Sequence, residues 1–202
     1  MLTVVTPAPS MVLTTVERAR RLASDGGQPD DVFAALLAHA SAAVSDFCHR
    51  VFPRQTYLQT FDMEDLSRGE IMLAQWPVTS ILSVTLDGTV LASSDYRQDD
   101  QWLSRSSGGF SRPWCGRTAE VLFTAGYTLP PDAACTLPLP VERAVALEAA
   151  AYGESADRDE LLKAETVEGV GSFSYRVPGA GDTLVSPTAA QLLRPYVAPR
   201  LM

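Results

Sequence analysis

Few residues of this chain have the type and spacing that catalysis or metal binding requires. The two histidines, His39 and His49, are ten residues apart in the sequence. On one helix this spacing rotates them by about 80° and separates them by ~15 Å, so they cannot share a metal ion within that helix. Cys48 directly precedes His49 and points to a different face. We therefore expect all three to be structural residues of a helix.

Other groups with chemical potential are also isolated in the sequence. Residues 106–109 place two serines before two glycines, as in a nucleophile turn, but the sequence places no histidine beside them. No G-x-S-x-G, Walker A or H-E-x-x-H pattern occurs. The pairs Glu64/Asp65 and Asp99/Asp100 could bind Mg²⁺ or Ca²⁺ weakly, although solvated loops commonly carry such carboxylates. A small metal-dependent hydrolase is a weak alternative, and we expect no enzyme activity, no cofactor and no metal.

The main basic cluster consists of Arg18, Arg20 and Arg21. It could contact DNA phosphates or an acidic partner surface, or it could be a solvated helix face. The formal net charge of −8 opposes tight binding to nucleic acid, because that binding depends on Lys and Arg displacing counterions. A DNA-packaging or DNA-binding accessory protein therefore stays as the alternative function.

Composition supports an ordered protein of 202 residues, 46% of them hydrophobic. Three widely spaced cysteines without a C-x-x-C pattern favour a reducing compartment. The N-terminus lacks the features of a signal peptide, and no apolar run approaches the ~20 residues of a membrane span. We expect a protein made in a cytoplasm, with no membrane partner.

Helices are expected on both sides of a β-rich middle. Residues 1–13 look irregular, and Thr14 with Glu17 forms a capping-box pattern that predicts a short helix to about residue 24. Residues 29–51 have apolar side chains on one broad face and predict a long amphipathic helix that Pro53 ends. An alanine-rich helix is expected over residues 141–152, after a proline-rich connector.

Short strands and tight turns are expected in the middle of the chain. Asp87-Gly88 is its best hairpin signal, and residues 105–113 look like a Ser/Gly-rich loop. Residues 164–202 contain too little apolar surface to fold alone, so they should dock on the domain or on a neighbouring molecule. Within them, Ser186-Pro187 predicts the start of a short helix.

The sequence thus predicts an α+β chain with a helical-bundle core, a small antiparallel β-rich insertion and an extended C-terminal tail. The predicted parts are an N-terminal arm, one domain and a docking tail, over residues 1–13, 14–163 and 164–202. Within the domain, helices are expected over about 14–53 and 139–163, and the β-module over about 55–127.

Five motifs follow one another in a fixed order. They are C-H-R-V-F at the end of the long helix, W-P-V-T-S-I-L-S-V-T-L-D-G, D-Y-R, V-L-F-T-A-G-Y, and L-P-L-P-V-E-R-A-V-A-L-E-A-A-A-Y. This order resembles the head–tail connector (adaptor, or head-completion) proteins of tailed bacteriophages and gene transfer agents. The similarity covers roughly residues 14–155, and S-P-T-A-A-Q-L-L-R-P-Y also looks like the end of some members.

The resemblance implies a non-catalytic subunit of a ring, commonly twelve-fold, beneath the portal in the neck of the virion. Such a ring extends the DNA channel and forms a platform for the stopper or tail-completion protein, and the genomic DNA passes through it without sequence-specific binding. In relatives the C-terminal segment reaches the portal. The candidate portal or subunit contacts are Phe173, Tyr175, Val177, Leu192, Leu193 and Tyr196. The candidate acidic residues of the channel or its loops are Asp62, Glu64, Asp65, Asp99 and Asp100.

Overall fold

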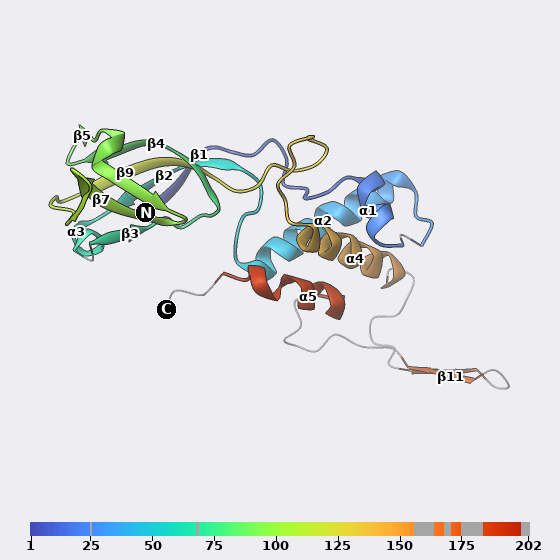
Figure 1. Ribbon diagram of the computed structural model, residues 1–202. Helices are drawn as coiled ribbons and strands as arrows, with labels where there is room; N and C mark the ends of the chain where they lie inside the picture. Colours follow the sequence, from blue (N-terminus) through green and yellow to red (C-terminus); the bar gives the residue numbers. More distant parts are fainter. Residues whose placement is uncertain (25, 68, 156–163, 168–170, 175–183, 199–202) are drawn as a thin grey trace. The chain divides into compact units, whose positions relative to one another are not determined.

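The computed structural model describes residues 1–24, 26–67, 69–155, 164–167, 171–174 and 184–198. It contains both helices and antiparallel sheets, which confirms the predicted α+β class (Figure 1). The chain divides into two compact units. Met1–Pro9 and Val51–Thr128 form the first, here called the β unit, and Ser10–Arg50 and Leu129–Met202 form the second, the helical unit.

The β unit is built from two antiparallel sheets. The larger sheet has the spatial order β1 (Leu2–Thr6), β2 (Gln55–Phe61), β9 (Ala119–Ala125), β4 (Val78–Leu86) and β5 (Thr89–Val90). The smaller sheet has the order β3 (Glu70–Met72), β7 (Trp102–Ser107) and β6 (Tyr96–Asp99), with β8 (Phe110–Arg112) also paired to β7. A short helix, α3 (Met63–Leu66), and a 3₁₀ turn, η1 (Ser93–Asp95), lie between strands.

One hydrophobic core joins the two sheets of the β unit. Strand β9 shows why: Val121 and Phe123 are fully buried, while Glu120 on the other face is exposed. Ile71 of β3 and Leu103 of β7 belong to the same buried cluster, so the smaller sheet contributes to this core. Alternating side chains of two facing sheets therefore supply the burial that stabilises the β unit.

Two predictions for the β unit were wrong. Leu2–Thr6 is an edge strand rather than an irregular arm, because it pairs with β2 from Leu2↔Gln59 to Thr6↔Thr56. All five of its side chains are exposed, so it carries no periodic burial signal. Residues 105–113 are not a loop, because β7 and β8 form a hairpin through most of them.

The predicted turn at Asp87-Gly88 is confirmed. It joins β4 to β5, and both residues have positive φ angles, 47° and 80°. The Oδ1 atom of Asp87 accepts hydrogen bonds from the backbone N–H groups of Arg117 and Thr118, at 2.8 and 2.9 Å. These bonds lower the pKa of Asp87, with the Thr118 bond contributing most.

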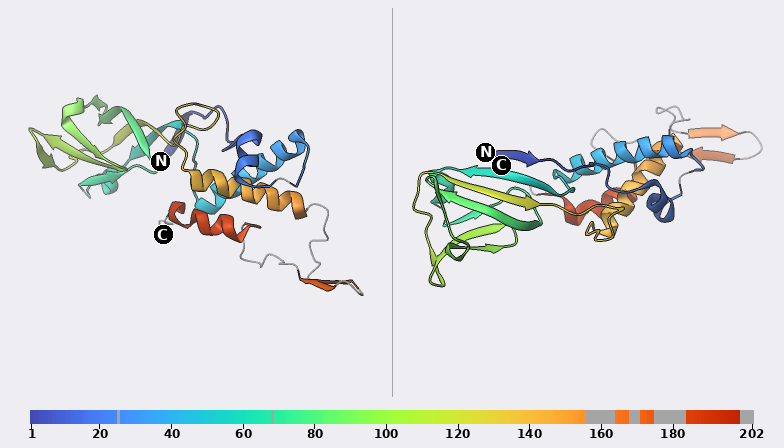
Figure 2. Two further views of the ribbon diagram at one scale, coloured as in Figure 1. Left: turned by 45° about the vertical axis from the view of Figure 1, so that its right-hand side comes forward. Right: turned by 90° about the horizontal axis from the view of Figure 1, so that it is seen from above.

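Four helices make up most of the helical unit. They are α1 (Val16–Leu22), α2 (Asp30–Cys48), α4 (Leu139–Ser155) and α5 (Pro187–Leu193), the last followed by the 3₁₀ turn η2 (Arg194–Tyr196). A hairpin of β10 (Ala164–Val167) and β11 (Gly171–Ser174) also belongs to it. Helix α4 contacts α1, α2 and α5, which makes it the central element of the unit (Figure 2).

The ends of these helices follow from local hydrogen bonds. Thr15, and not Thr14 as predicted, caps α1, because its hydroxyl accepts from the backbone N–H of Arg18. Helix α2 ends at Cys48, since His49 adopts a left-handed conformation with φ 52°, so Pro53 does not end it. The predicted cap of α5 is confirmed: the Ser186 hydroxyl accepts from the backbone N–H of Ala189 at 3.3 Å.

Helix α2 corrects the expectation that no apolar segment of the chain approaches the length of a membrane span. In the part of the chain that the structure describes, it is the one helix long and apolar enough to cross a membrane by length and composition. A core helix of a water-soluble protein passes the same test, and α2 buries Phe33, Leu37 and Val44 within the helical unit. Packing against α4 therefore accounts for its apolar face.

Candidate functional site

The two histidines and the cysteine first considered for catalysis or metal binding lie in the helical unit. His39 packs against Tyr152, with ring centroids 4.7 Å apart. Cys48 is buried, and burial raises the pKa of its thiol to about 11, so the thiol is protonated at neutral pH. Among the described residues, no group of three or more His, Cys, Asp or Glu side chains could hold a metal ion.

The most unusual groups of the helical unit are two buried carboxylates on α4. Glu142 is 1% exposed and Glu148 is 0% exposed. They are six positions apart, so they lie about 240° apart around the helix and face different neighbours. A buried carboxylate needs hydrogen bonds or a paired cation, and each of these has its own set of partners.

Glu142 connects α4 to α1 and to the segment before it. Arg18 donates from Nε to Oε1 at 2.6 Å and from an η nitrogen to Oε2 at 2.7 Å, and the Thr14 hydroxyl donates to Oε1 at 2.7 Å. Burial alone would raise the pKa of Glu142, but the bonds from Arg18 and Thr14 outweigh it and lower the pKa below its ordinary value. The same bidentate pair raises the pKa of Arg18.

Glu148 connects α4 to the C-terminal segment. Its two carboxylate oxygens accept hydrogen bonds from the backbone N–H groups of Val185 and Ser186, at 2.7 and 2.8 Å. Ser186 is the residue that caps α5, so Glu148 fixes the point at which the C-terminal helix begins. Burial, with a smaller contribution from the charge of Glu148, raises the pKa of Tyr152 to about 12.

The basic cluster on α1 is neutralised within the chain. Arg20 donates to Asp30 at 2.6 Å and to the carbonyl of Gln28 at 2.8 Å. Its guanidinium also lies 5.8 Å from the centre of the Phe33 ring. Arg21 pairs with Glu17 on the same helix, and Arg18 is held by Glu142. These internal pairs weaken the hypothesis that the cluster contacts DNA phosphates.

A groove runs along the exposed side of α2. It has a volume of about 850 Å³ and is lined by residues of α2 and α4 together with His49 and Val197. The backbone N–H of Ala198, next to Val197, donates to the carbonyl of Cys48 at 2.8 Å. The last described residues of the chain are thus fastened beside this groove.

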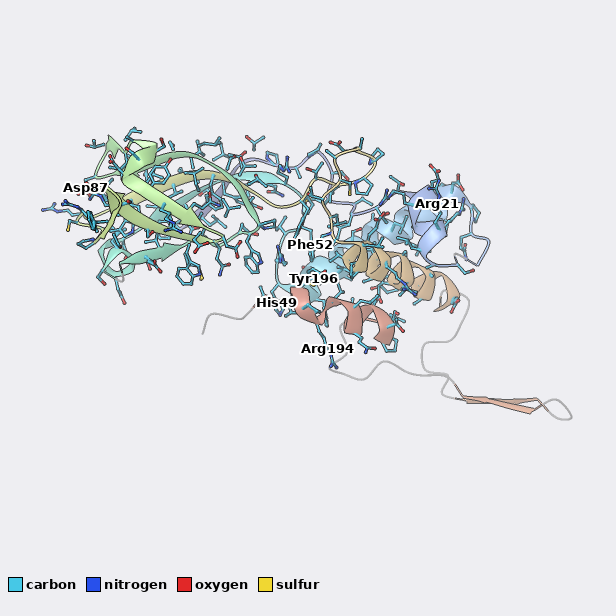
Figure 3. All side chains as sticks on the ribbon, viewed as in Figure 1. Arg21, His49, Phe52, Asp87, Arg194 and Tyr196 are labelled. Atoms are coloured by element: carbon cyan, nitrogen blue, oxygen red, sulfur yellow. The ribbon has the colours of Figure 1, made fainter. Side chains whose placement is uncertain are left out.

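The predicted contact residues of the tail fall into three groups. Leu193 is fully buried within the helical unit, so its side chain is not available to a partner. Leu192 and Tyr196 are half-buried and Arg194 is exposed; Figure 3 labels Tyr196 and Arg194, the last and first residues of the turn η2 that follows α5. Phe173 lies in β11, opposite Glu165 of β10. Tyr175 and Val177 lie outside the described residues.

The predicted acidic residues lie on two separate elements of the β unit. Asp62 directly precedes α3 and caps it, because its Oδ1 accepts from the backbone N–H groups of Glu64 and Asp65 at 3.0 and 3.2 Å. Asp99 ends β6, and Asp100 follows it in the turn to β7 with a φ angle of 52°. Most of these side chains are exposed, and Asp65 is half-buried.

Sequence reasoning missed the two buried glutamates. Both lie in the stretch V-E-R-A-V-A-L-E-A-A-A-Y, where a glutamate is ordinarily assigned to a solvated helix face. The sequence did carry one signal. Small residues occupy positions on nearly every side of this helix, which predicts that the helix is buried on several sides. A carboxylate inside such a helix must find donors from neighbouring elements.

Comparison with known proteins gives matches among solved structures. No protein-family model matches the chain, and no curated protein is similar to it. A chain in the neck of an empty GTA particle, computed with C6 symmetry, is 20% identical with a TM-score of 0.60. A chain in the neck of a native GTA particle, computed with C12 symmetry, is 19% identical with a TM-score of 0.59.

A chain in the virion of a native gene transfer agent particle is 21% identical with a TM-score of 0.61. Each of the three matches covers 100% of this chain and 97% of the other chain. At this identity the similarity concerns the fold, and it extends over both units of the chain. The resemblance predicted from the order of the sequence motifs is thereby confirmed at the level of the fold.

Proposed function

We propose that this chain is a structural subunit of the neck of a tailed phage or gene transfer agent particle. In that role it is an adaptor that forms a ring beneath the portal and catalyses no reaction. The observation that carries the proposal is the similarity of fold over the whole chain to chains in particle necks. One matching neck was computed with C12 symmetry, which agrees with a ring of twelve copies.

The charge distribution supports passage of DNA through such a ring. The chain has a formal net charge of −8, and the three arginines of α1 are paired with Glu142, Asp30 and Glu17. A channel wall of net negative charge attracts the phosphate backbone weakly, so DNA can slide through it. Asp62, Glu64, Asp65, Asp99 and Asp100 remain our candidates for the acidic channel or loop residues.

The C-terminal segment is the proposed portal contact. Helix α5 is held on α4 by Glu148, which presents the half-buried Leu192 and Tyr196. In this proposal the surface formed by Leu192 and Tyr196, with residues 164–183, meets the portal. Another face of the ring then receives the stopper or tail-completion protein.

Co-sedimentation with the portal protein of the same particle tests this proposal. We expect the purified full chain to sediment with assembled portal rings at a fixed ratio, close to one adaptor per portal subunit. The matched control is the same chain mixed with an unrelated portal ring, which should not retain it. Sedimentation of the chain apart from its own portal, at low and at physiological salt, would contradict the proposal.

A further inference from the structure

The hairpin of β7 and β8 carries an uncompensated pair of cations. Arg105 and Arg112 are direct cross-strand partners, which puts their Cβ atoms about 5 Å apart on one face of the sheet. Neither forms a salt bridge or a side-chain hydrogen bond with any described residue. Like charges placed directly opposite destabilise a hairpin, so this arrangement favours a partner that brings negative charge.

An aromatic side chain stands beside this pair. Phe110 begins β8 and pairs with Ser107 across the two-residue turn Gly108-Gly109. Both glycines have positive φ angles, 60° and 84°, which a tight two-residue hairpin requires. Phe110 is 78% exposed, although an aromatic ring loses hydrophobic stabilisation when it is left in water. Arginine and aromatic residues are the types enriched where protein interfaces carry most of their binding energy.

The other end of strand β7 has the opposite charge. Asp99 is the cross-strand partner of Trp102, and Asp100 follows in the turn between β6 and β7. Both carboxylates are exposed, have no side-chain partner among the described residues, and lie next to Trp102, which is 43% exposed. The two ends of β7 are ~17 Å apart along the strand.

The register of the strands disfavours an ion pair between these arginines and a carboxylate of the same sheet. Glu70 of β3 is the carboxylate nearest to them in the strand pairing, and it lies opposite Ser104. Successive residues of a strand point to opposite faces, so Glu70 lies on the face away from Arg105 and Arg112. No carboxylate on the described strands of this sheet therefore shares a face with the two arginines, which leaves their charge available to another molecule.

We propose that the Arg105–Arg112–Phe110 end of one copy docks on the Asp99–Asp100–Trp102 end of a second copy. A contact between two different patches of identical subunits is heterologous, and such a contact closes into a ring when the rotation between copies permits it. The proposal therefore rests on the ring of the proposed function and assigns its contact within the β unit. Charge complementarity favours this partner, because each end lacks what the other end supplies.

Charge reversal at the two ends tests this contact. Self-association of the full chain is measured by sedimentation velocity at low and high salt, for the wild type, Arg105→Glu/Arg112→Glu, and Asp99→Arg/Asp100→Arg. We expect salt-sensitive association of the wild type, an affinity reduced about tenfold or more in either double variant, and recovery when the two variants are mixed. Phe110→Ala should weaken association without making it less sensitive to salt.

A matched control and clear contrary outcomes make the test decisive. Arg54→Glu/Arg143→Glu changes the net charge equally at two exposed arginines and should associate as the wild type does. Equal association of all variants, absence of association of the wild type at low salt, or failure of the mixture to recover would overturn the proposal. Salt-sensitive binding of duplex DNA, lost in Arg105→Glu/Arg112→Glu with self-association unchanged, would overturn it in favour of phosphate recognition.

The hairpin contact and the adaptor role can each fail independently in these experiments. If the chain sediments with its portal and Arg105→Glu/Arg112→Glu does so equally well, the adaptor role stands and the hairpin contact fails. If the wild type does not sediment with its portal but self-associates through the two ends, the adaptor role fails and the hairpin contact stands.

Discussion

Replacement of Glu148 by alanine is expected to release the C-terminal helix from the helical unit. The change removes the acceptor of two backbone N–H groups, those of Val185 and Ser186, and leaves a void where the carboxylate was. Loss of these charge-assisted bonds and burial of the two unsatisfied donors should together lower the free energy of unfolding by about 2–4 kcal/mol. The buried side chains of Leu184, Ala189 and Leu193 would then become accessible.

Limited proteolysis with mass spectrometry and thermal unfolding measure this effect. The variant should be cleaved within residues 184–198 under conditions in which the wild type resists, and it should unfold at a lower temperature. Arg143→Gln is the matched control, because it removes one charge from an exposed position of the same helix. Unchanged protection of residues 184–198 in Glu148→Ala would show that side-chain packing alone holds α5.

The second large effect is expected at Glu142 and depends on pH. Replacement by glutamine breaks the bidentate pair with Arg18 and the bond from Thr14, and should lower the free energy of unfolding at neutral pH by about 2–3 kcal/mol. Because Arg18 is 43% exposed, water solvates its guanidinium and compensates part of the interaction lost with Glu142. The loss should therefore be smaller than that for a fully buried ion pair.

The sign of the pH dependence follows from the lowered pKa of Glu142. The folded chain holds fewer protons at this site than the unfolded chain, so unfolding takes up a proton and acid favours it. The stabilisation by ionised Glu142 is fully present above its pKa in the unfolded chain, about 4.3. It is lost as the pH falls through the lower pKa of the folded chain. Denaturant unfolding from pH 7 to pH 3 should therefore show a shallower decline for Glu142→Gln than for the wild type.

Glu120→Gln is the control for this profile, because Glu120 is an exposed carboxylate on β9. Its stability should follow that of the wild type at every pH. Parallel curves for Glu142→Gln and the wild type across the acid range would contradict the proposed linkage.

Prediction from the sequence succeeded where one residue's local chemistry determines the structure. A tight hairpin turn requires positive φ angles, which Asp87-Gly88 tolerates, and Ser186-Pro187 supplies a cap and a first-turn proline to α5. The long helix α2 was predicted because its apolar face extends over several turns. Its last residues were misplaced, since His49 ended it by a backbone conformation that the pattern does not encode.

The features that the sequence did not predict depend on contacts between distant segments. Strand β1 owes its conformation to pairing with β2, and all five of its own side chains are exposed. Glu148 was missed because its partners are backbone N–H groups 37 and 38 positions away. The pairing of Arg105 with Arg112 required the register of a hairpin that the Ser/Gly-rich composition had concealed.

Electron cryomicroscopy of the particle neck tests the proposed adaptor role most directly. We expect a ring of density directly beneath the portal, into which copies of the β unit and the helical unit fit as separate bodies. Particles made without this chain should lack that ring and keep the portal. A neck in which no density below the portal accommodates the two units, or whose ring persists when the chain is absent, would contradict the adaptor role.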